Sequence, residues 1–100
     1  MTRQVAESPV TQGPYEQIAY SFDWSAIGTP DSAGTVKIYD KTGTDTSGTN
    51  LTGSASLTGN IVTTPIVKSL TARGKYKLVS SVTISSNTLT AYLEIDVDWR

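Results

Sequence analysis

The last quarter of this 100-residue chain alternates between apolar and polar side chains almost without interruption, from Gly74 to Trp99. A period of two is typical of a β-strand that buries one of its sides. Turn-forming residues at Ser85-Ser86-Asn87 divide the stretch, which predicts an antiparallel hairpin within an all-β protein. The residues expected to point inward are Tyr76, Leu78, Ser80, Val82, Ile84, Leu89, Ala91, Leu93, Ile95, Val97 and Trp99.

The position of the turn also predicts the register of this hairpin. A two-residue loop at Ser86-Asn87 keeps the apolar pairs inside and sets opposite charges against each other outside. A four-residue loop in the same register is the alternative. The expected pairs are Ile84 with Leu89, Leu78 with Ile95, Tyr76 with Val97, Lys77 with Asp96 and Lys75 with Asp98.

Four more segments have strand character and are separated by turn-rich stretches. They span residues 16–24, 35–40, 51–57 and 61–67. The inward residues of the first two are Ile18, Tyr20, Phe22, Trp24, Val36 and Ile38. Pro65 predicts that the last segment lies at a sheet edge or contains a bulge. Six or seven antiparallel strands in this arrangement predict an immunoglobulin-like β-sandwich.

The corner before the penultimate strand offers a further sign of that fold. Leu70 and Tyr76 lie on either side of this corner. In immunoglobulin-like sandwiches, a tyrosine at this point bonds its hydroxyl group to backbone a few residues upstream. The alternative interpretation is an ordinary core tyrosine at the start of a strand.

Two segments of the chain lack the alternating pattern of the strands. Residues 1–14 show no period and contain Pro9 and Pro14, which predicts a flexible N-terminal arm before a sandwich domain over residues 15–100. The arm is either a free terminus or a strap that becomes ordered on a neighbouring subunit. The polar segment 41–50 is expected to be an exposed, mobile loop.

The residue types present argue against catalysis. The chain has no His and no Cys, so the usual nucleophile pairs and zinc sites are missing, and we predict neither an enzyme nor a cofactor. Glu94, Asp96 and Asp98 form an acidic row that acid–base chemistry or a hard cation would suit. Lysines are expected opposite two of them, which favours a solvated, salt-bridged row and no metal site.

Charge and hydropathy limit the partners. The formal net charge is −1 with both signs scattered, so nucleic acid is not an expected partner. The sequence has no apolar run long enough for a bilayer and a polar beginning, so neither a membrane location nor a signal peptide is expected. The lack of cysteine favours folding in a cytosol.

Four aromatic residues are candidates for a binding face. Trp24 and Trp99 fall on inward faces, which favours the core. Tyr39 and Tyr92 fall on outward faces. There, each is either an anchor for a protein partner, a stacking group for a sugar, or an ordinary cross-strand neighbour.

Two segments resemble a family of small virion proteins of tailed phages, described as fibre–tail adaptor-like. The strand Tyr20-Ser21-Phe22-Asp23-Trp24-Ser25, followed by Gly28, resembles the family's opening strand, and Gly74-Lys75-Tyr76 stands at its final corner. The resemblance covers roughly 40% of the chain, in residues 16–24 and 70–99. The turn at residues 28–31 and the segment 70–73 depart from the family's pattern, so the fold carries over better than any contact surface.

The resemblance implies a structural component of a virion, made in the host cytoplasm and assembled in several copies. Its expected partners are portal, connector, tail, fibre or capsid proteins, or further copies of itself. The predicted contact residues are Tyr39, Tyr92, Pro9, Val10, Pro14 and Tyr15. The alternative is an adhesion or carbohydrate-binding module of a surface or fibre protein, with Tyr39 and Tyr92 as stacking groups.

Overall fold

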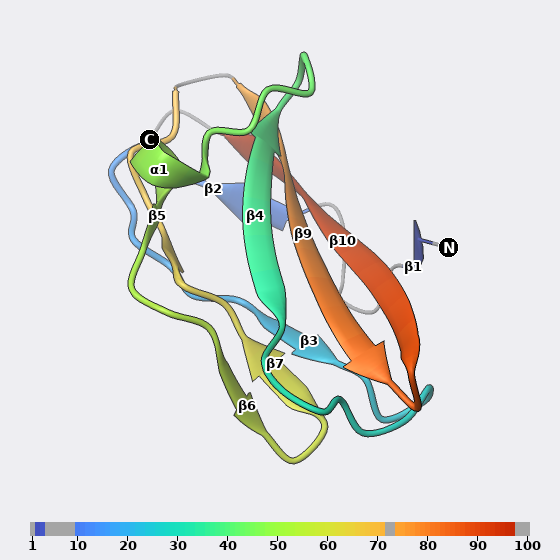
Figure 1. The fold of residues 1–100 in the computed structure, drawn as a ribbon. Coiled ribbons are helices and arrows are strands. Elements are labelled where there is room, and N and C mark those ends of the chain that lie inside the picture. Colours follow the sequence, from blue (N-terminus) through green and yellow to red (C-terminus); the bar gives the residue numbers. More distant parts are fainter. Residues whose placement is uncertain (1, 4–9, 72–73, 98–100) are drawn as a thin grey trace.

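A computed structural model describes residues 2–3, 10–71 and 74–97 of the chain. In these residues the protein is an all-β sandwich whose two layers face each other across one core (Figure 1). This confirms the prediction of an all-β sandwich. The described residues form ten strands and one short helix, because two of the expected strands are each divided into two pieces and two further strands lie in the predicted N-terminal arm.

The first sheet is built around the C-terminal hairpin. Its strands are β9 (Lys75–Ile84), β10 (Asn87–Val97), β4 (Thr35–Asp40), β1 (Thr2–Arg3) and β2 (Val10–Gln12). β4 pairs antiparallel with β9, whereas β1 and β2 both pair parallel with β10 along its other edge. The two parallel strands lie in the predicted N-terminal arm, whereas the strand pairs within the described part of the predicted domain are antiparallel, as expected.

The second layer consists of shorter strands. They are β3 (Ser21–Asp23), β7 (Ile61–Thr63) and β6 (Ser56–Thr58), in that order, and the pair β5 (Leu51–Thr52) with β8 (Ile66–Val67). The predicted strand at residues 61–67 is interrupted at Thr64 and Pro65, where proline has no N–H group to donate. β7 pairs with both β3 and β6, so the predicted edge position is wrong for this half, whereas β8 lies in a two-stranded sheet with β5; the strand breaks at Pro65, where an edge or a bulge was expected.

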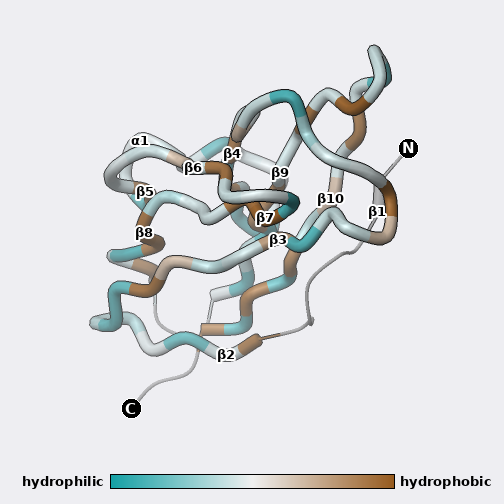
Figure 2. The backbone as a smooth tube through the Cα atoms, turned by 90° about the horizontal axis from the view of Figure 1, so that it is seen from below, coloured by the Kyte–Doolittle hydropathy of each residue, from teal (hydrophilic) through white to brown (hydrophobic). Residues whose placement is uncertain are grey.

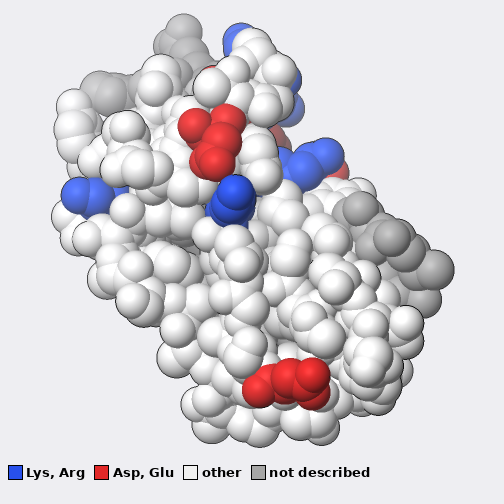
Figure 3. Space-filling model, viewed as in Figure 1, with Lys and Arg blue, Asp and Glu red and all other residues white. Residues whose placement is uncertain are grey.

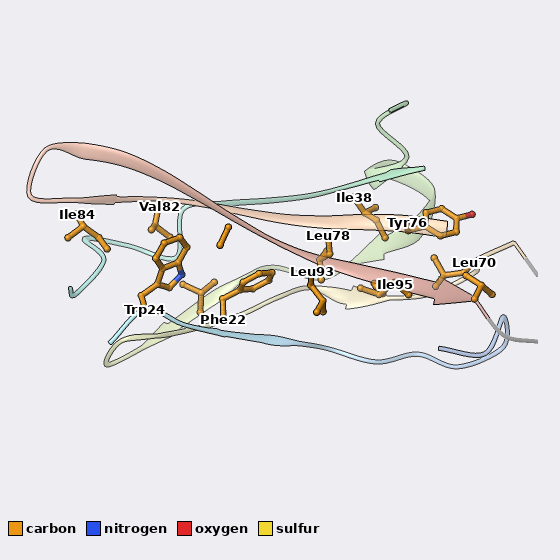
Figure 4. Close-up of a cluster of buried hydrophobic side chains, with 14 residues drawn as sticks. Phe22, Trp24, Ile38, Leu70, Tyr76, Leu78, Val82, Ile84, Leu93 and Ile95 are labelled. Carbon is orange, nitrogen blue, oxygen red and sulfur yellow. The ribbon is translucent and has the colours of Figure 1, made fainter. Parts of the chain in front are cut away.

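The core fills the space between the layers. Trp24 and Phe22 from the second layer and Leu78 and Leu93 from the first have almost no exposed surface. Figure 4 shows these side chains pointing toward one another across the sandwich. The alternation that places them there is visible along the strands in Figure 2. The inward faces predicted for the described strands are thus confirmed, with Ile18, Tyr20, Val36 and Leu89 only half-buried.

The hairpin turn lies one residue earlier than predicted. Ile84 pairs with Asn87, so the two loop residues are Ser85 and Ser86. Both have positive φ, 50° and 68°, as a type I′ turn requires, and this turn matches the right-handed twist of its strands. The register therefore moves by two residues, which keeps every side chain on its predicted face. The observed pairs are Leu89 with Val82, Leu93 with Leu78, Ile95 with Tyr76, Glu94 with Lys77 and Asp96 with Lys75.

Part of the predicted N-terminal arm belongs to the fold. Val10–Gln12 forms β2, and Gly13 and Pro14 are buried. Gln12 has no exposed surface, and its Nε2 donates to the carbonyl oxygens of Glu16 at 3.0 Å and Val67 at 2.9 Å. A flexible arm is therefore wrong for residues 10–14, because a buried amide ties them to the second layer. Residues 1 and 4–9 lie outside the described residues.

The polar segment 41–50 is only partly the exposed loop that its composition predicts. Residues 41–45 are exposed, but Ser47–Asn50 forms the short helix α1, and Asn50 is buried. Its Nδ2 donates to the carbonyl oxygens of Lys68 and Ser69, both at 3.1 Å. The Asn50 side chain thus supplies hydrogen-bond donors to two backbone carbonyl groups of a distant segment. Amino-acid composition alone does not predict such a contact.

The corner tyrosine forms the bond that its position predicts. The hydroxyl oxygen of Tyr76 accepts a hydrogen bond from the backbone N–H of Thr71 at 3.1 Å. This bond connects the start of β9 to the segment that leaves the second layer. In the described part of the chain, no helix has the length and apolar character needed to cross a membrane.

Candidate binding face

The two predicted outward tyrosines lie on the outer face of the first sheet, on either side of β9. Tyr39 of β4 lies opposite Lys77 of β9, and Tyr92 of β10 lies opposite Val79 of β9. The Nζ atom of Lys77 lies 4.7 Å from the centroid of the Tyr92 ring. This is a cation–π distance, and it means that the ammonium group covers a face of Tyr92.

Tyr39 borders a hollow of about 380 Å³ on this face. The volume falls within the range of small-molecule sites. The residues that line the hollow are Tyr39, Asp40, Lys41, Gly43, Lys75, Tyr76, Lys77 and Glu94. Tyr92 is not among them, so Tyr39 is the one outward tyrosine of the two that lines this hollow; Tyr76, which also lines it, is a core residue.

Two further hollows adjoin the first. One, of about 270 Å³, also has Tyr39 in its lining, with Thr35, Lys37, Val79 and Ser81. The other, of about 250 Å³, has Asp40, Lys41, Lys75 and Tyr76 in common with the first, and adds Thr42, Thr71 and Gly74. Because neighbouring hollows have lining residues in common, we define the three together as the β4–β9 groove.

Ionic groups of both signs lie along this groove. Lys37 and Asp45 are 3.9 Å apart, and Lys75 and Asp96 are 3.4 Å apart. Figure 3 shows acidic and basic side chains next to each other over β4, on a surface that otherwise carries few charges. These exposed ion pairs stabilise the fold weakly, so their polar atoms remain available to a ligand.

Asp40 organises the turn at one end of the groove. Its Oδ1 accepts bonds from the Thr42 hydroxyl at 2.6 Å, the Thr42 N–H at 2.9 Å and the Thr44 N–H at 3.1 Å. These bonds, the one from the Thr42 hydroxyl first, hold the pKa of Asp40 below its ordinary value. The carboxylate is therefore ionised at neutral pH and fixed in position.

The predicted contact residues of the N-terminal segment lie in different surroundings. Tyr15 is 81% exposed, which agrees with a surface contact. Val10 is half-buried against the core and Pro14 is buried, so this chain itself covers both and neither is a free contact. Pro9 lies outside the described residues. The alternation around residues 10–14 is too short to reveal this burial from the sequence.

Two of the three acidic residues expected in a row on the last strand face lysines in the structure. Glu94 faces Lys77 and Asp96 faces Lys75, while Asp98 lies outside the described residues. In the described part of the chain, no group of three acidic side chains lies close enough to hold a metal ion. In the observed register each lysine faces an acidic residue two positions earlier than expected, so acidic residues still face lysines.

The second layer has an outer face of another kind. Its outward residues are Ser21, Asp23, Thr52, Ser56, Thr58, Ile61, Thr63 and Ile66. Asp23 is the single charged residue among them, and Ile61 and Ile66 are 41% and 39% exposed. Sequence analysis missed this face. The available signal was the outward position of both isoleucines beside the inward Val62 and Val67.

Comparisons with protein-family models, with curated proteins and with solved structures find no match for this chain.

Proposed function

We propose that this protein is a non-enzymatic, immunoglobulin-like structural module that is assembled in several copies into the virion of a tailed phage. The resemblance of Tyr20-Ser21-Phe22-Asp23-Trp24-Ser25 and Gly74-Lys75-Tyr76 to fibre–tail adaptor-like proteins supports this role. In the fold, Phe22 and Trp24 fill the core, and Tyr76 fastens the corner to Thr71. The similar residues therefore support a shared fold, and the role follows from the resemblance.

The strand order supports the immunoglobulin-like part of this proposal. When the strands are lettered along the chain, β4, β9 and β10 correspond to C, F and G. β3, the β5/β6 pair and the β7/β8 pair correspond to B, D and E in the opposite layer. β2 corresponds to A, but it lies beside G and not beside B. The bond from Thr71 to the Tyr76 hydroxyl is the corner bond of such domains.

The observation that carries an assembly role is the outer face of the second layer. Interface centres in proteins are depleted of charged residues. On this face Ile61 and Ile66 are exposed among serines and threonines, and Asp23 is the single charged residue of the described strands there. We expect this face to contact a neighbouring copy or another virion protein.

Incorporation into particles tests this function. A phage that lacks the gene is complemented with the wild-type chain, Ile61→Lys or Ile66→Lys, and quantitative mass spectrometry measures copies per purified particle. A lysine in an interface centre should lower incorporation about tenfold, because its charge would lose water without a partner. Thr88→Lys, at an exposed position of β10, is the matched control and should be incorporated normally.

Two results would contradict the proposal. If purified particles lack the wild-type chain, the virion role is wrong. If Ile61→Lys and Ile66→Lys are incorporated as well as Thr88→Lys, the second-layer face is not the contact surface. Deletion of residues 1–13 is not a clean test, because it removes the buried Gln12 and so disturbs the fold.

A further inference from the structure

We propose that the β4–β9 groove binds a neutral, hydroxyl-rich oligosaccharide, with Tyr39 as the stacking residue. This inference is independent of the assembly proposal, because the groove lies on the outer face of the first sheet and the proposed contact surface on the second layer. The residues of the groove are those that line its three hollows.

The groove concentrates hydrogen-bonding side chains of complementary kinds. Four of the five lysines of the chain line it. They are Lys37, Lys41, Lys75 and Lys77, and only Lys68 lies elsewhere. Lysine ammonium groups only donate hydrogen bonds, whereas the carboxylates of Asp40 and Glu94 only accept them.

The mixture of donors and acceptors indicates the chemical class of the ligand. A polyanion would bind the lysines but would be repelled by Asp40 and Glu94, and by Asp45 and Asp96 that pair with two of the lysines. A sugar hydroxyl group both donates and accepts, so neighbouring hydroxyls satisfy ammonium and carboxylate groups at once. Hydroxyl groups of Thr35, Thr42, Thr71 and Ser81 extend the same chemistry along the groove.

Tyr39 is placed to carry the apolar part of the contact. It lines the two hollows of about 380 and 270 Å³, so a ligand that occupies both must cross it. Tyrosine combines a flat apolar ring with a polar hydroxyl group, which suits a sugar ring. Tyr92 does not offer this surface, since Lys77 covers its ring and none of the three hollows includes it.

The fold argues against an extended peptide as the ligand. Peptides that add to a sheet pair with free backbone groups at an edge. In the groove, β9 pairs with β4 on one side and with β10 on the other, and β4, the edge strand, already uses backbone groups of Ile38 and Asp40 in bonds to residues 44–47. Recognition here therefore depends on side chains, and the groove is rigid because strands and the Asp40 turn hold them.

Titration with named oligosaccharides tests the proposal. Cellotetraose, maltotetraose, laminaritetraose, mannotetraose and tetra-N-acetylchitotetraose are added to the isotope-labelled full chain, and tetragalacturonate and hexaglutamate serve as anionic probes. We expect at least one neutral tetrasaccharide to shift backbone amide signals of β4 and β9. Tyr39→Ala should weaken that binding about tenfold, whereas Tyr39→Phe keeps the ring and most of the affinity.

Matched variants separate the groove from general effects. Lys77→Gln should weaken binding, and Lys68→Gln, outside the groove, should not. Tyr92→Ala should leave the affinity within about twofold if Tyr39 alone stacks on the sugar. The proposal is overturned if none of the five neutral probes binds, if only tetragalacturonate or hexaglutamate binds, or if Tyr39→Ala binds as well as wild type while its amide spectrum shows a folded protein.

Discussion

The two layers of the sandwich bury one core with very different strands. β9 and β10 of the first sheet run for 10 and 11 residues, whereas no strand of the second layer exceeds three. The first sheet is held by a continuous backbone ladder. The second layer relies on side chains such as Thr64, Gln12 and Asn50, which satisfy backbone groups where the ladder stops.

The contrast shows two ways to meet the same physical requirement. Buried N–H and C=O groups must find partners in either layer. A strand with alternating side chains meets this requirement through its neighbours in the sheet. A strand interrupted by proline or glycine needs a polar side chain at a specific position, and its stability should then depend on single residues.

The largest effect is expected where the first sheet begins. Gly34, at φ 66°, leads into β4, and a Cβ there would lie 1.9 Å from the Ser81 carbonyl oxygen. Gly34→Ala should therefore lower the free energy of unfolding by about 4 kcal/mol, from the left-handed backbone and the clash together. Gly43, at φ 87°, has no neighbour within 4 Å, so Gly43→Ala should cost only about 1 kcal/mol. If urea denaturation showed equal losses of unfolding free energy for Gly34→Ala and Gly43→Ala, the predicted clash with Ser81 would be refuted.

The next largest loss of stability is expected at Gln12, whose side chain joins the two layers. Gln12→Ala leaves the hydroxyl of Tyr20 without its acceptor and removes the amide donor from the carbonyls of Glu16 and Val67, of which the second keeps its bond from the Ile18 N–H. We expect a loss of about 3 kcal/mol, because a polar group without a partner costs roughly 1–3 kcal/mol and truncation of a side chain with no exposed surface also leaves a cavity. The exposed Thr11 in the same strand is the control, and Thr11→Ala should change stability by less than about 0.5 kcal/mol.

If Gln12→Ala were as stable as Thr11→Ala in the same denaturation experiment, β2 would contribute nothing measurable to stability. The prediction of a free arm would then hold in solution despite the pairing of β2 with β10. The experiment thus decides between the sequence-based interpretation and the structure.

The contrast between the layers also explains what sequence analysis achieved. The hairpin and β4 could be predicted because alternation is a local signal, and a shift of two residues leaves it unchanged. The turn position failed because Ser85 and Ser86 are not the residues that usually adopt positive φ. Gln12 and Asn50 could not be found, because their partners lie 55 and 18 residues away along the chain.

The same distinction between local and long-range signals applies to the candidate binding residues. Tyr39 and Tyr92 were correctly placed on an outward face, since alternation decides that. The sequence could not show that Lys77 covers Tyr92, because the side-chain contact depends on the strand pairing. The grouping of four lysines around one groove likewise depends on which strand pairs with which.

A third prediction concerns the break in the second layer. Thr64 Oγ1 accepts a bond from the Tyr20 N–H at 3.0 Å and donates to the Pro65 carbonyl at 2.8 Å. Thr64→Val keeps the shape but removes both bonds, so we expect a loss of about 2 kcal/mol. Thr63→Val, one position along and facing outward, should change stability by less than about 0.5 kcal/mol. Similar losses of stability in both variants would mean that the Thr64 side chain does not take the place of the missing backbone hydrogen bonds.

A fourth prediction uses pH to probe the same region. Burial, and then the charge of Glu16, raise the pKa of Tyr20 from 10.0 to about 12. The fold thus favours the neutral phenol, and its contribution to stability is complete below pH 10 and is lost as pH rises toward 12. Denaturation between pH 9 and 12 should show a smaller decline in Tyr20→Phe than in wild type. Identical declines would show that Tyr20 ionises equally well in the folded and unfolded chain.

The smallest effect tests the register of the hairpin. Lys75 and Asp96 face each other at 3.4 Å, with 73% and 45% of their side chains exposed. A double-mutant cycle with Lys75→Ala and Asp96→Ala should give a coupling energy of about 0.3 kcal/mol, because exposed pairs are weak. The cycle between Lys77 and Asp96, the pair expected from a turn at Ser86-Asn87, should give none. A coupling found in the second cycle and missing from the first would restore that register, and with it a turn that does not need positive φ at Ser85.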